Sequence, residues 1–204
     1  QVDIDMIAGP SEIGVIADES ANPVHLAADL LSQAEHDPRA RAIMVTTSEK
    51  PAKLVSDEVE RQLSQLPRES IARPAIENNS YIAVMDSVED MFTVMNEVAP
   101  EHLEIQLPDP MEYMSMVENA GSVFLGRHPS EPLGDYVGGT NHVLPTSGTA
   151  KFLSPLGVYD LVKRISFTQF SRERLQEVAK YITTLARTEG LEAHARAIEV
   201  RFEK

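Results

Sequence analysis

The sequence predicts an α/β protein in which helices cover a parallel sheet. Two observations predict this class: short apolar runs rich in β-branched residues recur along residues 13–125, and stretches with helical apolar spacing separate them. Strands that alternate with helices of this length pair in parallel through crossover helices. A segment rich in glycine and proline follows over 126–148, and the pattern is helical from about residue 155 onward.

The first strand and helix are predicted within residues 13–34. Ile13–Ala17 is a short apolar run, and Asn22 is a candidate N-cap for a helix with Pro23 at its first position. One face of this helix is predicted to be apolar. Its members are Val24, Ala27, Ala28 and Leu31.

Two further strand and helix pairs follow. Ala42–Thr46 is strand-like, and Ser48 is a candidate cap for one long helix whose apolar positions extend to Leu66. Tyr81–Met85 is the third predicted strand, and Ser87 and Asp90 follow it at the spacing of a capping box.

The last two predicted strands are Leu103–Leu107 and Ser122–Leu125. Between them, Asp109 and Pro110 predict the start of a helix, and Gly121 predicts its end.

The C-terminal part is predicted to form helices. Ser171 is a candidate cap, and Gly190 separates that helix from a last one. The tail has too few apolar positions to build its own core, so we expect it to pack on another surface, such as another subunit.

Composition excludes several classes of function. The chain has 204 residues, no cysteine and a formal net charge of −14. Cysteine chemistry and cysteine-bound metals are therefore excluded, and the acidic balance argues against nucleic acid as a partner. Apolar runs are too short for a membrane span, and no signal peptide pattern opens the chain. The expected compartment is the cytoplasm.

The first ten residues resemble the interior of a protein. Val2, Ile4, Met6 and Ile7 suit a strand or a core. Either an expression tag was trimmed, or the chain is the C-terminal part of a longer protein.

Gln33 and His36 are three residues apart near the end of the first predicted helix, so they project from one face. On spacing alone, the favoured interpretation is a histidine that interacts with the helix dipole. An amide oxygen is an uncommon metal ligand.

Glu101 and His102 are adjacent, after Pro100, at a junction between a helix and a strand. Such pairs are common at surfaces. An acid and an imidazole held together are also suited to moving a proton from an alcohol.

Residues 134–142 form the densest polar and glycine-rich stretch. Asp135 is a candidate metal ligand, and His142 is a candidate ligand or a residue that orients one. A surface turn is the alternative, although a loop this long inside a domain is unusual unless it is functional. The chain contains neither a dinucleotide fingerprint nor a phosphate-binding P-loop.

Glu189 and His194 lie at the break between the last two predicted helices, where solvated helix ends are the favoured local interpretation. Gln, Asp and two His together form a nitrogen and oxygen set that suits zinc, manganese or cobalt.

Read together, these segments resemble the C-terminal half of histidinol dehydrogenases. The matches follow the family's order along nearly the whole chain. They are Asp5–Glu12, Leu31–Asp37, Ala99–Glu104, Ala120–Gly126, Gly134–Pro145 and Glu189–His194.

The resemblance implies two successive NAD-dependent oxidations of L-histidinol, through an aldehyde, to L-histidine. It implies zinc ligation by Gln33, His36, Asp135 and His194, and proton transfer by Glu101 and His102. The implied substrate contacts are Ser11, Gln33, His36, His102, Asp135, Glu189 and His194. In the family, the residues matching Glu189 and His194 come from the partner subunit, which implies a homodimer.

Within this resemblance, we expect the metal to orient the substrate. His102 would accept the alcohol proton, and Glu101 would activate the water that attacks the aldehyde.

Family members are about twice as long, and their cofactor contacts lie mostly in the half that is absent here. We therefore expect residues 1–12 to end a preceding domain, 13–154 to form part of an incomplete Rossmann-like domain, and 155–204 to form a helical dimerisation segment. The chain alone is expected to bind NAD poorly and to be inactive, and its sheet to have an exposed edge or apolar face.

Two other functions remain open. One is a non-catalytic module that binds metal and substrate and assembles into dimers. The other is a zinc hydrolase with Glu101 as its base, which is disfavoured because hydrolytic zinc needs an open position and four protein ligands are available.

Overall fold

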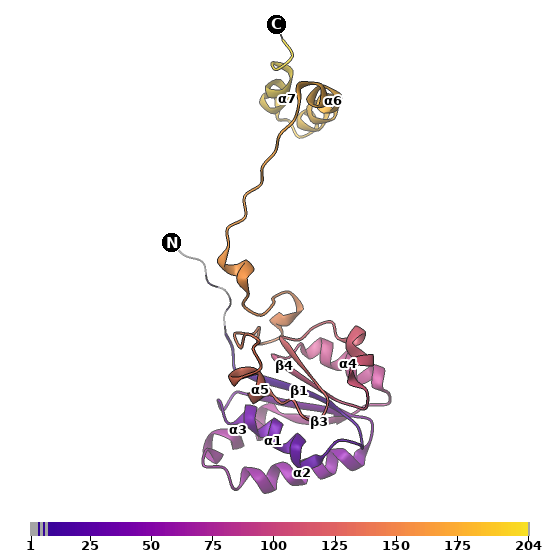
Figure 1. The fold of residues 1–204 in the computed structure, drawn as a ribbon, viewed down its shortest axis with the longest axis vertical. Helices are drawn as coiled ribbons and strands as arrows, with labels where there is room; N and C mark the ends of the chain where they lie inside the picture. The colour runs from indigo at the N-terminus through magenta and orange to yellow at the C-terminus, as the bar shows by residue number, and fades with distance from the viewer. Residues whose placement is uncertain (1–3, 5, 7, 204) are drawn as a thin grey trace. The chain divides into compact units, whose positions relative to one another are not determined.

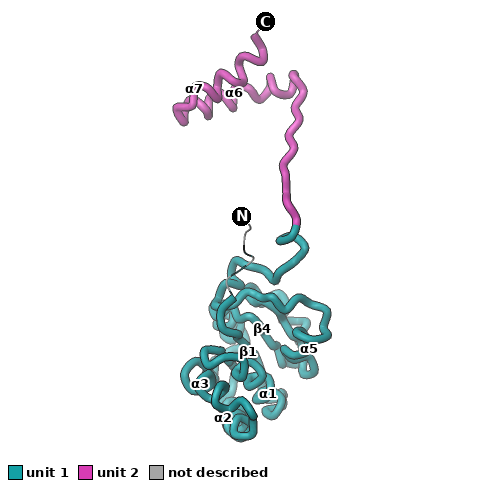
Figure 2. Tube along the Cα trace, turned by 90° about the vertical axis from the view of Figure 1, so that its left-hand side faces the viewer, with its two compact units in different colours: residues 1–161 teal, residues 162–204 magenta. Residues whose placement is uncertain are grey.

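The computed structural model describes Ile4, Met6 and residues 8–203. It divides into two compact units, Gln1–Leu161 and Val162–Lys204, and each unit is described by itself (Figure 2). The strand expected across Val2–Ile7 lies mostly outside the described residues, and neither Ile4 nor Met6 is in a strand.

The first unit contains a five-stranded parallel sheet with the order β3-β2-β1-β4-β5 (Figure 1). This confirms the predicted α/β class, and all five strands lie within two residues of their predicted bounds. The strands are β1 Glu12–Ala17, β2 Arg41–Thr46, β3 Tyr81–Val84, β4 His102–Gln106 and β5 Ser122–Leu125. The order reverses between β1 and β4, as in doubly wound nucleotide-binding folds.

Helices cover both faces of the sheet and build two cores. One core lies beneath α1 Pro23–Ala34, α2 Glu49–Leu63 and α3 Glu69–Asn79. The other lies beneath α4 Val88–Val98 and the 3₁₀ helix η1 Pro110–Met116. Each crossover buries one apolar face of a helix against the sheet, which is the main stabilising contribution.

The predicted caps of three helices are confirmed. The side chains of Asn22, Ser48 and Ser87 accept hydrogen bonds from backbone N–H groups in the first turns of α1, α2 and α4. The predicted apolar face of α1 is partly wrong, because Val24 and Ala28 are exposed. The helix instead buries Leu26, Ala27, Leu30, Leu31, Gln33 and Ala34.

Two helical predictions differ from the structure. The single helix expected up to Leu66 ends at Leu63, and α3 was not predicted. The buried residues of α3 are Ala72 and Ala75, whose small side chains give a weak apolar period, and Pro74 stands inside the helix.

The helix expected between Asp109 and Gly121 is a 3₁₀ helix that ends at Met116. Asn96 of α4 gives the physical reason. Its amide accepts from the Glu118 N–H at 2.9 Å and donates to the Met116 carbonyl at 2.8 Å. These backbone groups therefore bond to a side chain in place of the helical partners that would continue the helix.

The segment 126–148 contains the short helix α5 Glu131–Tyr136 and then returns to the amino ends of the strands. There, the Gly9 N–H donates to Thr146 Oγ1 at 2.5 Å, and the Ser147 N–H donates to Glu12 Oε2 at 3.0 Å. The long loop is therefore anchored at the start of β1.

The second unit contains α6 Arg172–Thr188 and α7 Glu192–Glu199. Ser171 caps α6 as predicted, and Gly190 turns the chain with a φ of 76°. The prediction of helix from residue 155 onward is wrong for 155–157 and for 162–170; in the second stretch, Ile165 and Phe167 are exposed. Short helices need packing to be stable, and no described residue of this unit buries Ile165 or Phe167. Along the described part of the chain, no helix combines the length and apolar character that a membrane crossing requires.

Candidate functional site

Polar side chains gather near the amino end of β4, on the face of the sheet that α1 covers. Because α1 runs antiparallel to β1, its last turn brings Gln33 to the amino ends of the strands. His102 begins β4 and pairs in register with Ile13, a residue of the core beneath α1. Side chains alternate along a strand, so Glu104 and Gln106 lie on the same face as His102.

Glu101 and His102 both contact the backbone of Glu12. The Glu12 N–H donates to Glu101 Oε2 at 3.1 Å, and the Glu12 carbonyl lies 3.2 Å from His102 Nδ1. A carbonyl only accepts hydrogen bonds, so Nδ1 carries the ring proton and Nε2 keeps its lone pair. The imidazole is thus fixed with one basic nitrogen.

Burial moves the pKa values of this couple in opposite directions. Burial, together with the charges of Glu12 and Asp135, raises the pKa of Glu101 to about 7, against the lowering effect of the hydrogen bond from the Glu12 N–H. Burial lowers the pKa of His102 to about 4. At neutral pH, the imidazole is uncharged and the carboxyl group titrates.

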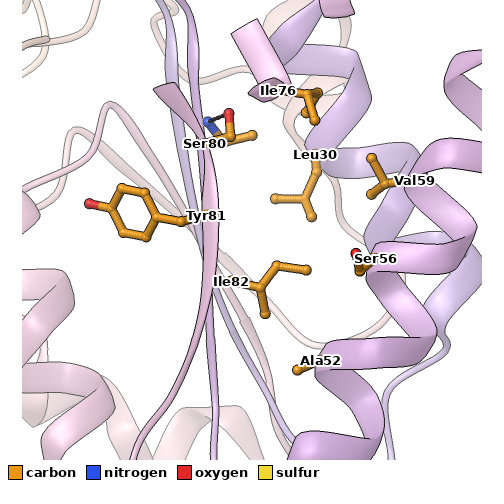
Figure 3. A pocket seen from close by; sticks show the side chains of 9 residues that line it. Leu30, Ala52, Ser56, Val59, Ile76, Ser80, Tyr81 and Ile82 are labelled. Atoms are coloured by element: carbon orange, nitrogen blue, oxygen red, sulfur yellow. Dashed lines mark hydrogen bonds between the residues drawn. The ribbon is translucent and has the colours of Figure 1, made fainter. Parts of the chain in front are cut away.

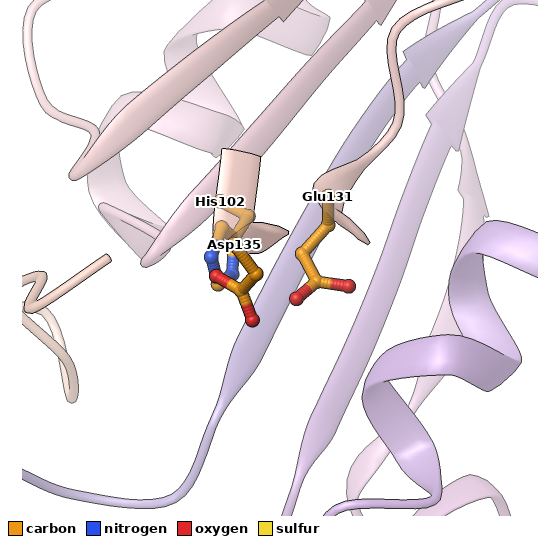
Figure 4. Close-up of side chains that lie close together, drawn as sticks. All are labelled: His102, Glu131 and Asp135. Carbon is orange, nitrogen blue, oxygen red and sulfur yellow. The ribbon is translucent and has the colours of Figure 1, made fainter. Parts of the chain in front are cut away.

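His102 also belongs to a second cluster, with Glu131 and Asp135 (Figure 4). Ligand atoms of these three residues lie within 4.8 Å of one another. Burial raises the pKa of Glu131 to about 8, with further contributions from the hydrogen bond to Asp135 and from its charge. Carboxylate and imidazole groups at this spacing can hold a divalent metal ion or a cationic ligand.

The helix α5 is placed by contacts to β4, α1 and β5. The Glu131 N–H donates to Glu104 Oε1 at 3.3 Å, and Ser32 Oγ donates to Glu131 Oε2 at 3.4 Å. A Cβ at Gly134 would lie 2.8 Å from the Phe124 ring, so glycine is what allows α5 to approach β5 this closely. The same ring packs on His102, with 6.1 Å between centroids.

Asp29, Glu104 and Gln106 form a mostly buried polar cluster, and Glu104 connects it to the start of α5. Gln106 Nε2 donates to Asp29 Oδ2 at 3.0 Å and to Glu104 Oε2 at 2.7 Å. Burial, together with the charge of Asp29, raises the pKa of Glu104 to about 9. Glu104 is therefore protonated at neutral pH and can donate to the Asp29 carboxylate.

Gln33 is almost completely buried, and neither its amide oxygen nor its amide nitrogen has a hydrogen-bond partner among the described residues. Buried amides normally have partners, so this side chain is suited to a ligand. His36 is exposed after the end of α1, and its charge is near enough to lower the pKa of His102.

The remaining candidates lie elsewhere in the chain. Ser11 is half-buried directly before β1, and its carbonyl accepts from the Arg41 N–H at 3.0 Å. His142 is exposed in the segment after α5. Glu189 and His194 belong to the second unit, where both are exposed at the turn between α6 and the start of α7.

The sequence pattern of the family described as histidinol dehydrogenase matches residues 1–202. The chain belongs to the histidinol dehydrogenase family. It is 64 % identical over 203 residues to the histidinol dehydrogenase of Lactiplantibacillus plantarum and 62 % identical to that of Streptococcus mutans. The predicted family is thereby confirmed.

A solved structure of a family member has the same fold. The crystal structure of histidinol dehydrogenase from Elizabethkingia anophelis matches 99 % of this chain with a TM-score of 0.91 and 44 % identity, over 46 % of its own chain. The alignments with the proteins of Lactiplantibacillus plantarum and Streptococcus mutans likewise cover all of this chain. They cover only 47 % and 48 % of those two proteins. The chain spans about half the length of the histidinol dehydrogenases that it matches.

The donor set fits a divalent metal ion. Glu131 and Asp135 offer carboxylate oxygens in one place, beside the imidazole of His102, and the unpartnered amide of Gln33 offers another oxygen. Among the described residues, no lysine or arginine is within ion-pair distance of Glu101, Glu131 or Asp135. A bound cation would offset the repulsion among these carboxylates.

Sequence reasoning missed Glu131 and Glu12. Glu131 precedes Pro132 in a segment expected to be a loop, and its burial and the bond of its carboxylate with Ser32 show that it faces inward. Glu12 belongs to the segment Asp5–Glu12 that resembles the family. Its contacts to Glu101 and His102 are made by its backbone, so the identity of its side chain does not predict them.

A separate pocket of about 360 Å³ lies between β3 and the helices α1, α2 and α3 (Figure 3). Leu30, Val59, Ile76 and Ile82 give it an apolar lining. No predicted site residue lines it, so its chemistry is distinct from that of the cluster on β4.

Proposed function

We propose that this chain provides the substrate-binding and proton-transfer residues of an NAD-dependent histidinol dehydrogenase. Such an enzyme oxidises L-histidinol to L-histidine through the aldehyde, in histidine biosynthesis. The observation that carries the proposal is the convergence of Glu101, His102 and Asp135 at the amino end of β4 in a chain of this family. The proposed compartment is the cytoplasm.

The proposed zinc ligands are Gln33, His36, Asp135 and His194. His102 and Glu131 lie beside one of them, Asp135. Bound zinc supplies a Lewis acid that anchors the nitrogen atoms of the substrate. The buried, unpartnered amide of Gln33 supports this assignment. His142 remains a candidate for orienting a ligand.

The proposed base of the first oxidation is His102. Its lowered pKa keeps the imidazole neutral at pH 7, and the hydrogen bond from Nδ1 to Glu12 leaves Nε2 free to accept the alcohol proton. The hydride goes to NAD.

The proposed base of the second oxidation is Glu101. Its pKa of about 7 leaves a large ionised fraction at neutral pH, and the carboxylate is more basic than an exposed one. Glu101 would take a proton from the water that adds to the aldehyde, and the resulting hydrate loses the second hydride.

The proposed cofactor contacts lie in the part of the relatives that this chain does not span, because no dinucleotide fingerprint occurs here. The substrate contacts expected in this chain are Ser11, Gln33, His36, His102, Asp135, Glu189 and His194. We assign Glu189 and His194 to the site of a partner subunit in a homodimer. Their position in a separate unit of exposed helices is compatible with that role.

The test is NADH formation from L-histidinol by the full-length protein that contains this chain. Asp135→Asn is expected to lower kcat/KM at least about 100-fold because it removes a charged ligand. Asp109→Asn is the matched control, because Asp109 is exposed with a φ of 47°, which Asn also adopts. The proposal is wrong if the parent forms no NADH or if Asp135→Asn keeps its activity within threefold.

A second candidate is a module that binds metal and substrate without catalysis. It is favoured by the chain's length, about half that of its relatives. Calorimetric titration of the full-length protein with zinc and then L-histidinol, with NAD present, separates the two functions. Binding without NADH formation describes a module, whereas turnover excludes it.

A further inference from the structure

One residue contacts both members of the Glu101–His102 couple. The backbone of Glu12 donates its N–H to Glu101 Oε2 at 3.1 Å and offers its carbonyl to His102 Nδ1 at 3.2 Å. Glu12 is the first residue of β1 and is 3 % exposed, so both hydrogen bonds are shielded from water.

The side chain of Glu12 is held independently of these backbone contacts. Arg41 Nη1, at the start of β2, lies 3.2 Å from Glu12 Oε1, and the Ser147 N–H donates to Oε2 at 3.0 Å. Ser147 has a φ of 57°, a left-handed conformation that non-glycine residues rarely adopt. The two carboxylate oxygens thus connect the neighbouring strand with the loop that returns from α5.

We propose that Glu12 is a positioning residue for Glu101 and His102, a role that rests on the proposed function. Its carboxylate fixes the backbone of Glu12 against Arg41 and Ser147. The carbonyl of Glu12 in turn holds the ring proton of His102 on Nδ1, and its N–H fixes one oxygen of Glu101. The free Nε2 and the second carboxylate oxygen are left to act on substrate.

A merely structural ion pair would have a different signature. Loss of such a pair lowers stability or substrate binding, whereas loss of positioning lowers kcat, because a displacement of about 1 Å can cost on the order of 100-fold in rate. Of the expected substrate contacts, Ser11 and His102 lie beside Glu12, whereas Gln33 and Asp135 lie on α1 and α5, so KM for L-histidinol is expected to change less than kcat.

The experiment compares Glu12→Ala and Arg41→Gln in the full-length protein, with Arg39→Gln as control. Arg39 is two residues before Arg41, and it forms an exposed ion pair with Asp37 that does not involve Glu12. We expect kcat for both the alcohol and the aldehyde to fall at least about tenfold in the first two variants, with KM within threefold. The control is expected to match the parent.

Hydrogen exchange of peptides spanning residues 9–14, followed by mass spectrometry, gives a readout that does not need activity. Faster exchange in Glu12→Ala and Arg41→Gln, together with lower kcat, supports the proposal. Unchanged exchange, or a loss expressed only in KM, overturns it. A parent that protects these amides but forms no NADH overturns the proposed function and leaves the exchange comparison to decide the positioning role.

Discussion

Glu101 and His102 are neighbours in the chain, and burial shifts their pKa values in opposite directions. Both shifts have the same cause, because a low-dielectric environment disfavours the charged form of any group. For the carboxyl group this raises the pKa to about 7, and for the imidazole it lowers the pKa to about 4. The two side chains are therefore suited to different proton transfers.

Substitutions at these residues are expected to separate the two oxidations. His102→Asn removes the free Nε2, so oxidation of the alcohol is expected to fall at least about 100-fold, while oxidation of supplied aldehyde persists. Glu101→Gln is expected to impair the aldehyde step more. Stopped-flow measurement of NADH formation from each substrate checks both.

The opposite pattern would contradict this assignment of roles. If His102→Asn stopped aldehyde oxidation while alcohol oxidation remained intact, His102 could not be the base of the first step.

Glu104 is expected to make stability depend on pH. Its pKa is raised to about 9 in the folded chain, so between its ordinary value near 4.5 and pH 9 the unfolded chain loses a proton that the folded chain keeps. Stability from this group is therefore present below pH 4.5 and is lost as pH rises. Each pH unit in that window contributes at most about 1.4 kcal/mol.

Glu104→Gln should remove much of this dependence, since an amide resembles the protonated carboxyl group. Between pH 5 and pH 8, we expect the free energy of unfolding to fall less in this variant than in the parent. The difference between the two falls is expected to be up to about 4 kcal/mol, measured by urea titration. Glu118→Gln, at an exposed position, is the control. A parent-like slope in Glu104→Gln would show that Glu104 does not retain its proton.

At the scale of elements, α5 connects the sheet to the site. It carries Glu131 and Asp135, and its approach to β5 depends on the missing side chain of Gly134. A Cβ 2.8 Å from the Phe124 ring requires the helix or the ring to move, and that ring packs on His102.

Gly134→Ala is expected to lower kcat/KM at least about tenfold and stability by about 1–3 kcal/mol, because overpacking displaces α5. Gly157→Ala is the control, since its Cβ would meet atoms only at ordinary contact distance and its φ is not positive. Steady-state kinetics and thermal unfolding measure the two effects. Parent-like activity in Gly134→Ala would mean that α5 does not set the geometry of the site.

Elements with local signals were predictable. Ser48, Ser87 and Ser171 cap helices because each side chain satisfies a free N–H a few residues later. The end at Met116 depends on tertiary contacts, the bonds of Asn96 to Met116 and Glu118, and no local pattern encodes those.

The site was predictable only in part, for the same reason. Resemblance to a family identified Asp135 and the Glu101–His102 pair, and the structure brings these residues together. Glu131 and the backbone of Glu12 enter the site through contacts between segments far apart in the sequence. Such contacts become visible only when the sheet is assembled.

At the scale of the whole molecule, the site lies at an unusual end of the sheet. In doubly wound folds, ligands bind at the carboxyl ends of the strands where the strand order reverses. Here the order reverses between β1 and β4, and Glu12 and His102 begin these two strands. The carboxyl ends of the strands are thereby left free of the proposed chemistry.

The chain alone is expected to bind zinc and L-histidinol weakly and to form no NADH, because it spans about half of its relatives and has no nucleotide fingerprint. Absorbance at 340 nm, with zinc, L-histidinol and NAD supplied, checks this. Sustained turnover by the 204-residue polypeptide would show that the cofactor site is within it.

The most direct test of the account is a crystal structure of the full-length protein with zinc and L-histidinol, using anomalous scattering at the zinc edge. We predict one zinc peak per chain, in contact with Gln33, His36 and Asp135, with substrate beside Glu101 and His102. Zinc bound away from Asp135, with the Gln33 amide still unpartnered, would contradict the account.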